Sequence, residues 1–103
     1  MDITQNTVIN ANGTYWFPQQ SGYGSNAFVE VAGTFASATF QIVYKDLAGA
    51  TTPYKDLDGA VKTFSAANFV GIDVPKSCRV GITVAAATAS TALKAVLHSS
   101  KDL

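Results

Sequence analysis

The sequence predicts an all-β protein: an antiparallel β-sandwich of jelly-roll or immunoglobulin-like type with about seven or eight strands. Val, Ile and Thr account for 26 of the 103 residues, and their branched side chains favour strands. Large apolar residues alternate with small or polar ones in several segments, which is the pattern of half-buried strands. Turn residues separate these segments at intervals of about 8–15 residues, as in sandwiches and barrels.

In chain order, the expected strands are 7–10, 15–17, 28–31, 39–45, 61–64, 69–74, 78–84 and 93–98. The alternation is clearest in 39–45, 78–84 and 93–98, each of which places its large residues on one face. The segment 69–74 is less cleanly divided, and we expect it to be buried on both faces. The alanine-rich stretch 85–92 has no apolar stripe and contains Thr and Ser, so we expect a connection there rather than a helix.

The seven-residue segment 44–50 recurs as 54–60 with six identical positions. The repeat is too short for a solenoid, and its Asp and Gly residues predict two similar turns. A second interpretation is that Tyr44 and Tyr54 lie beside neighbouring loops and form a binding edge.

Composition indicates a single domain over 13–103, preceded by a polar N-terminal arm at 1–12. Charged residues make up 14 %, the net charge is zero, and ordinary domains carry about 25 % charged residues. This composition excludes intrinsic disorder and disfavours a nucleic-acid partner. We expect no membrane association, because neither a signal-peptide pattern nor a long apolar stretch is present. A neutral, charge-poor surface favours association with other protein subunits.

No motif for catalysis, a cofactor or a metal is recognisable, so the sequence predicts a non-enzyme without cofactor or metal residues. His98 is the only histidine and is expected at the surface. Cys78 is the only cysteine and is expected to be a buried, inert side chain. The segment starting at Asp56 is not a calcium loop, because its twelfth position is Ala67 rather than Glu.

The aromatic run Tyr15–Trp16–Phe17 is the most informative local feature. Alternation places Trp16 on one face, where we expect it to anchor the core, and Tyr15 and Phe17 on the other. Exposed aromatic residues are effective anchors at protein interfaces. The candidate interface residues are therefore Tyr15, Phe17, Tyr23 and Tyr54.

Gly13-Thr-Tyr-Trp16 is followed by Val-Glu-Val-Ala-Gly-Thr-Phe at 29–35, Ala-Thr-Phe-Gln-Ile-Val-Tyr-Lys-Asp at 38–46 and Cys-Arg-Val-Gly-Ile at 78–82. The order of these four motifs resembles that of small virion structural proteins of tailed bacteriophages. The resemblance covers roughly residues 13 to 99. It implies a β-sandwich located on a virion, and it carries no catalytic residues over to this chain.

These observations lead us to expect a capsid decoration or cement protein that is assembled into virions in the host cytoplasm. Its partners would be the major capsid protein or other virion proteins, and a homo-oligomer, with a trimer favoured, would multiply weak contacts. The arm would add a strand to a neighbour. Two alternatives remain open: a neck or tail component, and a carbohydrate- or receptor-recognition module on a fibre or spike. The second would use Trp16, Tyr15, Tyr23 and Tyr54, and it requires those aromatic side chains to be exposed together.

Overall fold

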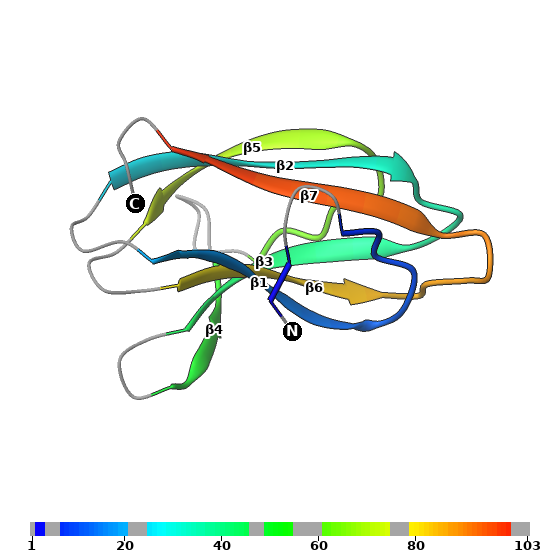
Figure 1. The fold of residues 1–103 in the computed structure, drawn as a ribbon, viewed down its shortest axis with the longest axis horizontal. Coiled ribbons are helices and arrows are strands. Elements are labelled where there is room, and N and C mark those ends of the chain that lie inside the picture. Colours follow the sequence, from blue (N-terminus) through cyan, green and yellow to red (C-terminus); the bar gives the residue numbers. More distant parts are fainter. Residues whose placement is uncertain are drawn as a thin grey trace.

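The computed structural model describes residues 2–3, 7–20, 25–45, 49–54, 61–74 and 79–99. Seven strands form two antiparallel sheets that lie one above the other (Figure 1). The strands are β1 (Gly13–Gln20), β2 (Ser25–Thr34), β3 (Thr39–Lys45), β4 (Thr51–Pro53), β5 (Asn68–Val74), β6 (Arg79–Ala85) and β7 (Ala92–Ser99). The predicted all-β sandwich is therefore confirmed.

The four-stranded sheet has the order β1-β6-β3-β4, and the three-stranded sheet has the order β5-β2-β7. Among the described strands, only β3 and β4 are neighbours both in sequence and within a sheet. Every other connection between consecutive strands passes from one sheet to the other. This connectivity holds the two layers together, because neither sheet is formed by one continuous stretch of chain.

The core lies between the sheets and is built by the predicted alternation. Phe40 and Ile42 of β3 and Val80, Ile82 and Val84 of β6 point inward from the four-stranded sheet. The other layer contributes Val29, Val31, Leu93, Ala95 and Leu97. The strand predictions at 28–31, 39–45, 78–84 and 93–98 therefore fall on β2, β3, β6 and β7, although Cys78 lies outside the described residues.

The expectation that 69–74 is buried on both faces is wrong. Ile72 faces the core, but Phe69 and Gly71 are exposed. The reason is that the four-stranded sheet packs against one face of this three-stranded sheet only, and among the described residues no layer covers the other face. The apolar run therefore covers the core with one face and meets solvent with the other.

The three shorter predicted strands have different outcomes. Residues 15–17 lie within β1, whereas 7–10 and 61–64 contribute only isolated bridges, from Ile9 to Leu93 and from Phe64 to Phe40. Strand β4 was not expected from the sequence, because its three residues are all exposed and carry no apolar alternation. The stretch 85–92 contains no helix, as predicted.

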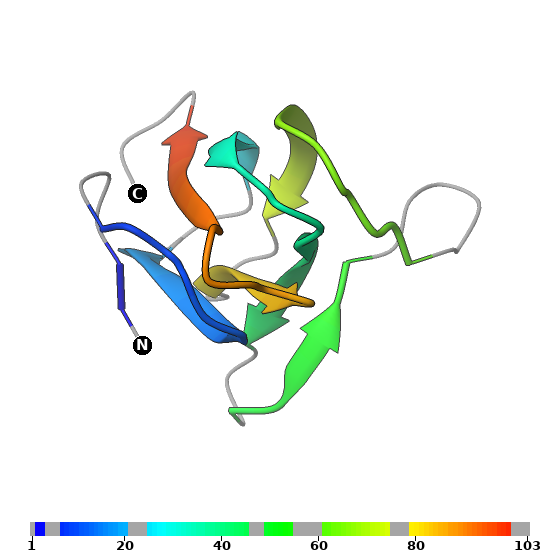
Figure 2. The same cartoon turned by 90° about the vertical axis from the view of Figure 1, so that its right-hand side faces the viewer.

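The described residues of the N-terminal arm pack on their own domain. Ile3 donates its backbone N–H to the Trp16 carbonyl at 2.9 Å, while Ile9 and Leu93 exchange two backbone bonds of 2.7 and 2.9 Å. Both isoleucine side chains are buried in the core. The arm thus lies along the side of the sandwich between β1 and β7 (Figure 2). The described residues of the expected arm at 1–12 are therefore in contact with the domain expected over 13–103.

Candidate interaction surface

Two of the four candidate interface residues are core residues. Tyr15 is only 6 % exposed and Phe17 only 2 %, because both point inward from β1. The Tyr15 hydroxyl donates to the Ala11 carbonyl at 2.6 Å, which satisfies its polar end. The expectation that Tyr15 and Phe17 remain exposed is therefore corrected, and Tyr23 lies outside the described residues.

Trp16 lies on the opposite face of β1, as the alternation predicts. It stands opposite Gly81 of β6 in the strand register, and Lys45 Nζ lies 4.5 Å from the centroid of its ring. Trp16 is only 7 % exposed, so it is an anchor of the outer side of the four-stranded sheet rather than of the central core. With Trp16 and Tyr15 both buried, the aromatic patch required by the carbohydrate alternative is not formed by these residues.

The two tyrosines of the internal repeat do come together. The rings of Tyr44 and Tyr54 meet edge to face with centroids 5.9 Å apart. Both side chains are half-buried and pack against the core, while the repeated turns at 46–48 and 55–60 lie outside the described residues. The structure therefore supports a packing role for Tyr54 at this position.

Among the described residues, the exposed aromatic side chains lie on the outer side of the three-stranded sheet. Phe28 of β2 is 47 % exposed and Phe69 of β5 is 53 % exposed, and their ring centroids are 5.1 Å apart. His98 of β7 stacks on Phe69 at 5.2 Å, and its Nε2 lies 2.8 Å from Glu30 Oε1. We call this side of the sheet, which presents Phe28, Glu30, Ala32, Phe69, Gly71, Lys94, Val96 and His98, the outer face.

Farther along the outer face, a hollow of about 290 Å³ lies between the arm and the sheet. Val8, Ala32, Gly33, Ala92 and Lys94 line it. Val8 is exposed because it alternates with the buried Ile9. The hollow is apolar apart from the Lys94 side chain, so it suits an apolar side chain of a partner.

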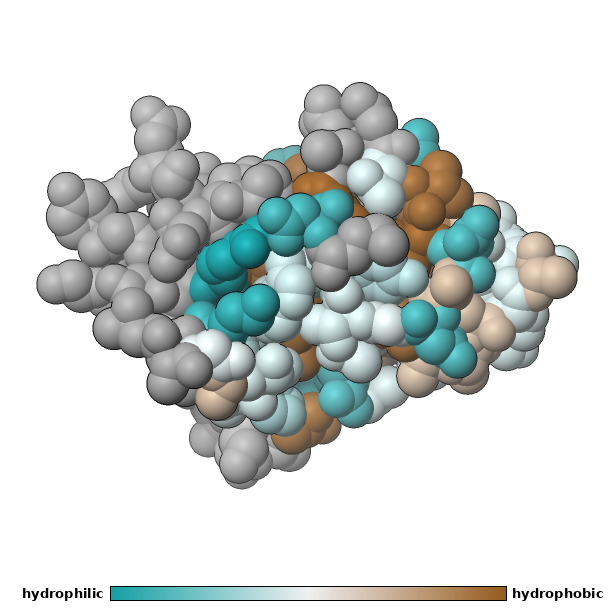
Figure 3. Space-filling view, turned by 60° about the horizontal axis from the view of Figure 1, so that its bottom comes forward, coloured by the Kyte–Doolittle hydropathy of each residue, from teal (hydrophilic) through white to brown (hydrophobic). Residues whose placement is uncertain are grey.

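The outer side of the four-stranded sheet has a different character. Thr14 and Thr83 hydroxyls lie 3.1 Å apart, and the Gln41 amide donates to the Thr63 hydroxyl at 2.9 Å. Figure 3, in which this layer comes forward, shows neutral and hydrophilic residues over much of the described surface, with hydrophobic ones in separate places. The outer face of the three-stranded sheet is thus the better candidate for an apolar contact.

Sequence reasoning missed Phe28 and Phe69, although a signal was present. Phe28 alternates with Val29 and Val31, so it had to face away from them. His98, in contrast, is exposed as predicted. Within the described ranges, no group of three or more His, Cys, Asp or Glu side chains could hold a metal ion, and no helix is long and apolar enough to cross a membrane.

Comparison of the chain with protein-family models, with curated proteins and with solved structures finds no match.

Proposed function

We propose that this chain is a non-enzymatic structural protein of a bacteriophage virion, and that it decorates or cements the capsid through contacts with neighbouring subunits. Its outer face would supply the contact, against the major capsid protein or another virion protein. The observation that carries the proposal is the exposed pair Phe28 and Phe69, on the same face as an apolar hollow. Exposed apolar patches of this kind are typical of protein interaction sites.

The strength of such a contact is limited. Complete burial of an exposed Phe side chain stabilises a complex by about 1.5–3 kcal/mol, before the cost of association is subtracted. Two half-exposed phenylalanines therefore give a weak single contact. A protein that acts in many copies on a repeating surface turns weak contacts into durable attachment through avidity, which is the situation of a decoration protein.

Charge supports the same proposal. Exposed strand surfaces normally carry Lys and Glu, whereas here the net charge is zero and only 14 % of residues are charged. On the outer face, Glu30 and His98 already contact each other. Apart from Lys94 at the hollow, a partner would therefore meet little unpaired charge on this face, and desolvation would oppose docking only weakly. The sequence resemblance to small phage virion proteins is the reason for proposing that the assembly is a virion.

The direct test is to sediment particles from cells that produce this protein and to follow the chain by quantitative mass spectrometry. We expect it to co-sediment with capsids in numbers comparable to the major capsid protein. A few copies per particle would indicate a neck or tail position and contradict the decoration role. Recovery only in the fraction free of particles would overturn the proposal as a whole.

The contact surface is tested with matched variants. Phe28→Ser removes an exposed ring from the outer face, and Val61→Ser removes an exposed apolar side chain outside the seven strands. In a second pair, each variant adds one negative charge. Ala32→Glu places it in the hollow of the three-stranded sheet, and Thr51→Glu places it on β4 of the four-stranded sheet. We expect Phe28→Ser and Ala32→Glu to reduce particle occupancy and the two controls to retain it. Equal occupancy for all four would show that the outer face is not the contact.

A further inference from the structure

Within the described part of the chain, strand β5 leaves one row of backbone groups without a partner strand. Leu93 of β7 exchanges two backbone hydrogen bonds with Ile9, so the backbone N–H and C=O groups of Leu93 point away from β2. In an antiparallel ladder, the backbone groups of successive residues point alternately to the two sides of the strand. The backbone groups of Val96, three residues after Leu93, therefore point toward β2, where Val96 is paired with Glu30. The backbone groups of Glu30 therefore point toward β7. Phe69, which lies opposite Glu30 on β5, receives no ladder hydrogen bonds from it.

It follows that the backbone N–H and C=O groups of Phe69, Gly71 and Asp73 face the open edge. A side-chain contact agrees with this assignment. The Phe69 N–H donates to Asn68 Oδ1 at 2.8 Å, which gives this outward donor a partner from its own strand. Among the described residues, no strand other than β2 pairs with β5.

Edges elsewhere in the molecule are shortened or covered. β4 has three residues and ends at Pro53, and the arm covers parts of β7 and β1 through Ile9 and Ile3. β5 is seven residues long, pairs with β2 without a bulge and contains neither Pro nor Lys. Short length, a covering segment, a bulge, Pro and Lys are the features that usually keep edge strands from pairing. Their absence in β5 marks it as an edge able to accept another strand.

We propose that two copies of this chain pair through β5, antiparallel, about a two-fold axis at Gly71. This register overlaps Asn68–Val74 over its whole length and sets Phe69 opposite Asp73 of the second copy. The outward groups then form hydrogen-bonded pairs. The zero net charge of the chain leaves no overall repulsion between copies.

The side chains near the axis fit this pairing. Gly71 has no side chain, and the Phe28 ring reaches over it, with Cε1 3.1 Å from the position that a Cβ would occupy. Two glycines at the axis let the Phe28 rings of both copies approach each other across the outer face, with Phe69 beside them. Both half-exposed phenylalanines would gain apolar contact, which is the complementarity that an isologous interface requires.

The pair has two consequences. It joins the three-stranded sheets into one six-stranded sheet and presents two hollows on one surface, so that docking becomes bivalent. It is also a two-fold contact, unlike the trimer favoured by the sequence. The pairing is a property of the isolated chain and does not depend on the proposed function.

Sedimentation equilibrium of the full-length chain tests the proposal. We expect a reversible monomer–dimer equilibrium. Gly71→Lys sets like charges opposite each other at the axis and should weaken the dimer about tenfold or more. Ala32→Lys, which adds the same charge to the outer face away from β5, should leave it unchanged. Asn68→Ala frees the Phe69 N–H for the ladder and should strengthen the dimer.

A monomer at all accessible concentrations, a trimer without a dimer, or equal effects of Gly71→Lys and Ala32→Lys would overturn the proposal. Circular dichroism melts confirm that each variant is folded. Cross-linking gives a second measurement that does not depend on weak association. In a Cys78→Ala background, Gly71→Cys places two thiols in a hydrogen-bonded pair whose Cα atoms are about 5.5 Å apart, within reach of a disulfide.

We expect mild oxidation to yield a covalent dimer with Gly71→Cys and none with Ala32→Cys in the same background. Equal yields from the two positions, or none from either, would contradict pairing at β5.

Discussion

Gly81 of β6 lies directly beneath the indole of Trp16. A Cβ placed on Gly81 would lie 2.6 Å from Trp16 Cε3 and would also collide with the Tyr15 carbonyl oxygen. β6 is an interior strand between β1 and β3, so its backbone cannot move aside freely. The missing side chain is therefore what allows Trp16 to be buried on the outer side of a sheet.

Gly81→Ala is expected to destabilise the fold by about 1–3 kcal/mol, the usual cost of overpacking a tight site. Gly71→Ala is the matched control, because its Cβ would meet only the exposed Phe28 ring at 3.1 Å, which can rotate away. Urea unfolding monitored by Trp16 fluorescence measures both. Equal stability of the two variants would show that the Trp16–Gly81 contact is looser than described.

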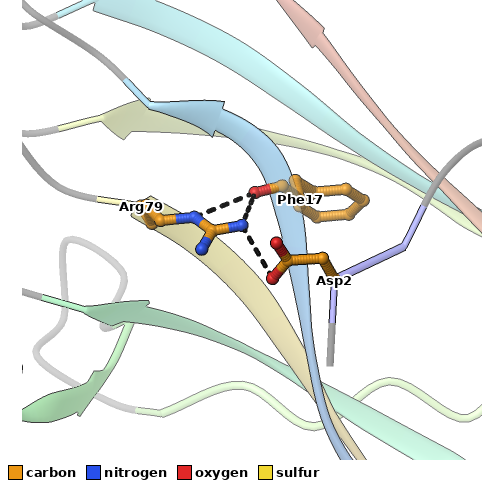
Figure 4. Close-up of polar contacts among 3 residues, drawn as sticks. All are labelled: Asp2, Phe17 and Arg79. Carbon is orange, nitrogen blue, oxygen red and sulfur yellow. Dashed lines mark hydrogen bonds and ion pairs between the residues drawn. The ribbon is translucent and has the colours of Figure 1, made fainter.

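Arg79 joins the arm to the middle of β1 (Figure 4). Its Nη2 donates to the Phe17 carbonyl at 2.8 Å and to Asp2 Oδ1 at 3.0 Å, and its Nε donates to the same carbonyl at 3.2 Å. The β1–β6 register shifts between Trp16 and Gln20. The Arg79 guanidinium therefore supplies hydrogen bonds to the Phe17 carbonyl at the place where the ladder is interrupted.

The two partners of Arg79 predict two different costs. Arg79→Ala removes the donors to a part-buried carbonyl and is expected to cost about 1–3 kcal/mol. Asp2→Asn removes only an exposed ion pair and is expected to cost less than about 1 kcal/mol, with a loss that shrinks as salt is added. Thermal unfolding at low and high salt separates them. A larger, salt-sensitive loss for Asp2→Asn would reverse this assignment.

Alternation within single strands made much of the fold predictable. Val80, Ile82 and Val84 are inward-facing as the pattern requires, and so are Leu93, Ala95 and Leu97. Sheet order was not predictable, because it depends on which distant strands pair. The exposure of β5 illustrates this: its apolar run is typical of a buried strand, but its sheet is packed on one face only, so Phe69 and Gly71 are exposed.

The candidate site was harder to predict than the fold. The sequence makes Tyr15 and Phe17 interface candidates because aromatic residues are good anchors at interfaces, but the same property makes them good core residues. Their burial follows from the second sheet packing over that face of β1. Phe28 carried a clearer signal, since it shares a face with Glu30 and alternates with two buried valines.

The neighbouring residues Val8 and Ile9 test how the arm is held. Ile9→Ala opens a cavity in the core and is expected to cost about 2–5 kcal/mol. Val8→Ala alters an exposed side chain and should change the free energy of unfolding by less than about 0.5 kcal/mol. Chemical denaturation compares the two. A near-neutral Ile9→Ala would mean that the arm is detached in solution and free to reach a neighbour, as the sequence suggested.

Phe40 and Phe64 form the contact that ties the 61–67 segment to the four-stranded sheet. They exchange two backbone bonds of 2.9 Å, and their rings stack with centroids 5.0 Å apart. Phe40 is fully buried, so Phe40→Ala is expected to cost about 3–5 kcal/mol. Phe64 is half-buried, and Phe64→Ala should cost less.

A double-mutant cycle isolates the ring contact from the burial of each side chain. Because stacked aromatic pairs contribute about 0.5–1.5 kcal/mol beyond their buried area, the double variant should lose less than the sum of the single variants by that amount. The backbone bonds remain in every variant, so they do not enter the coupling energy. Strict additivity would mean that the two rings stabilise the sandwich independently and that their stacking does not hold the 61–67 segment in place.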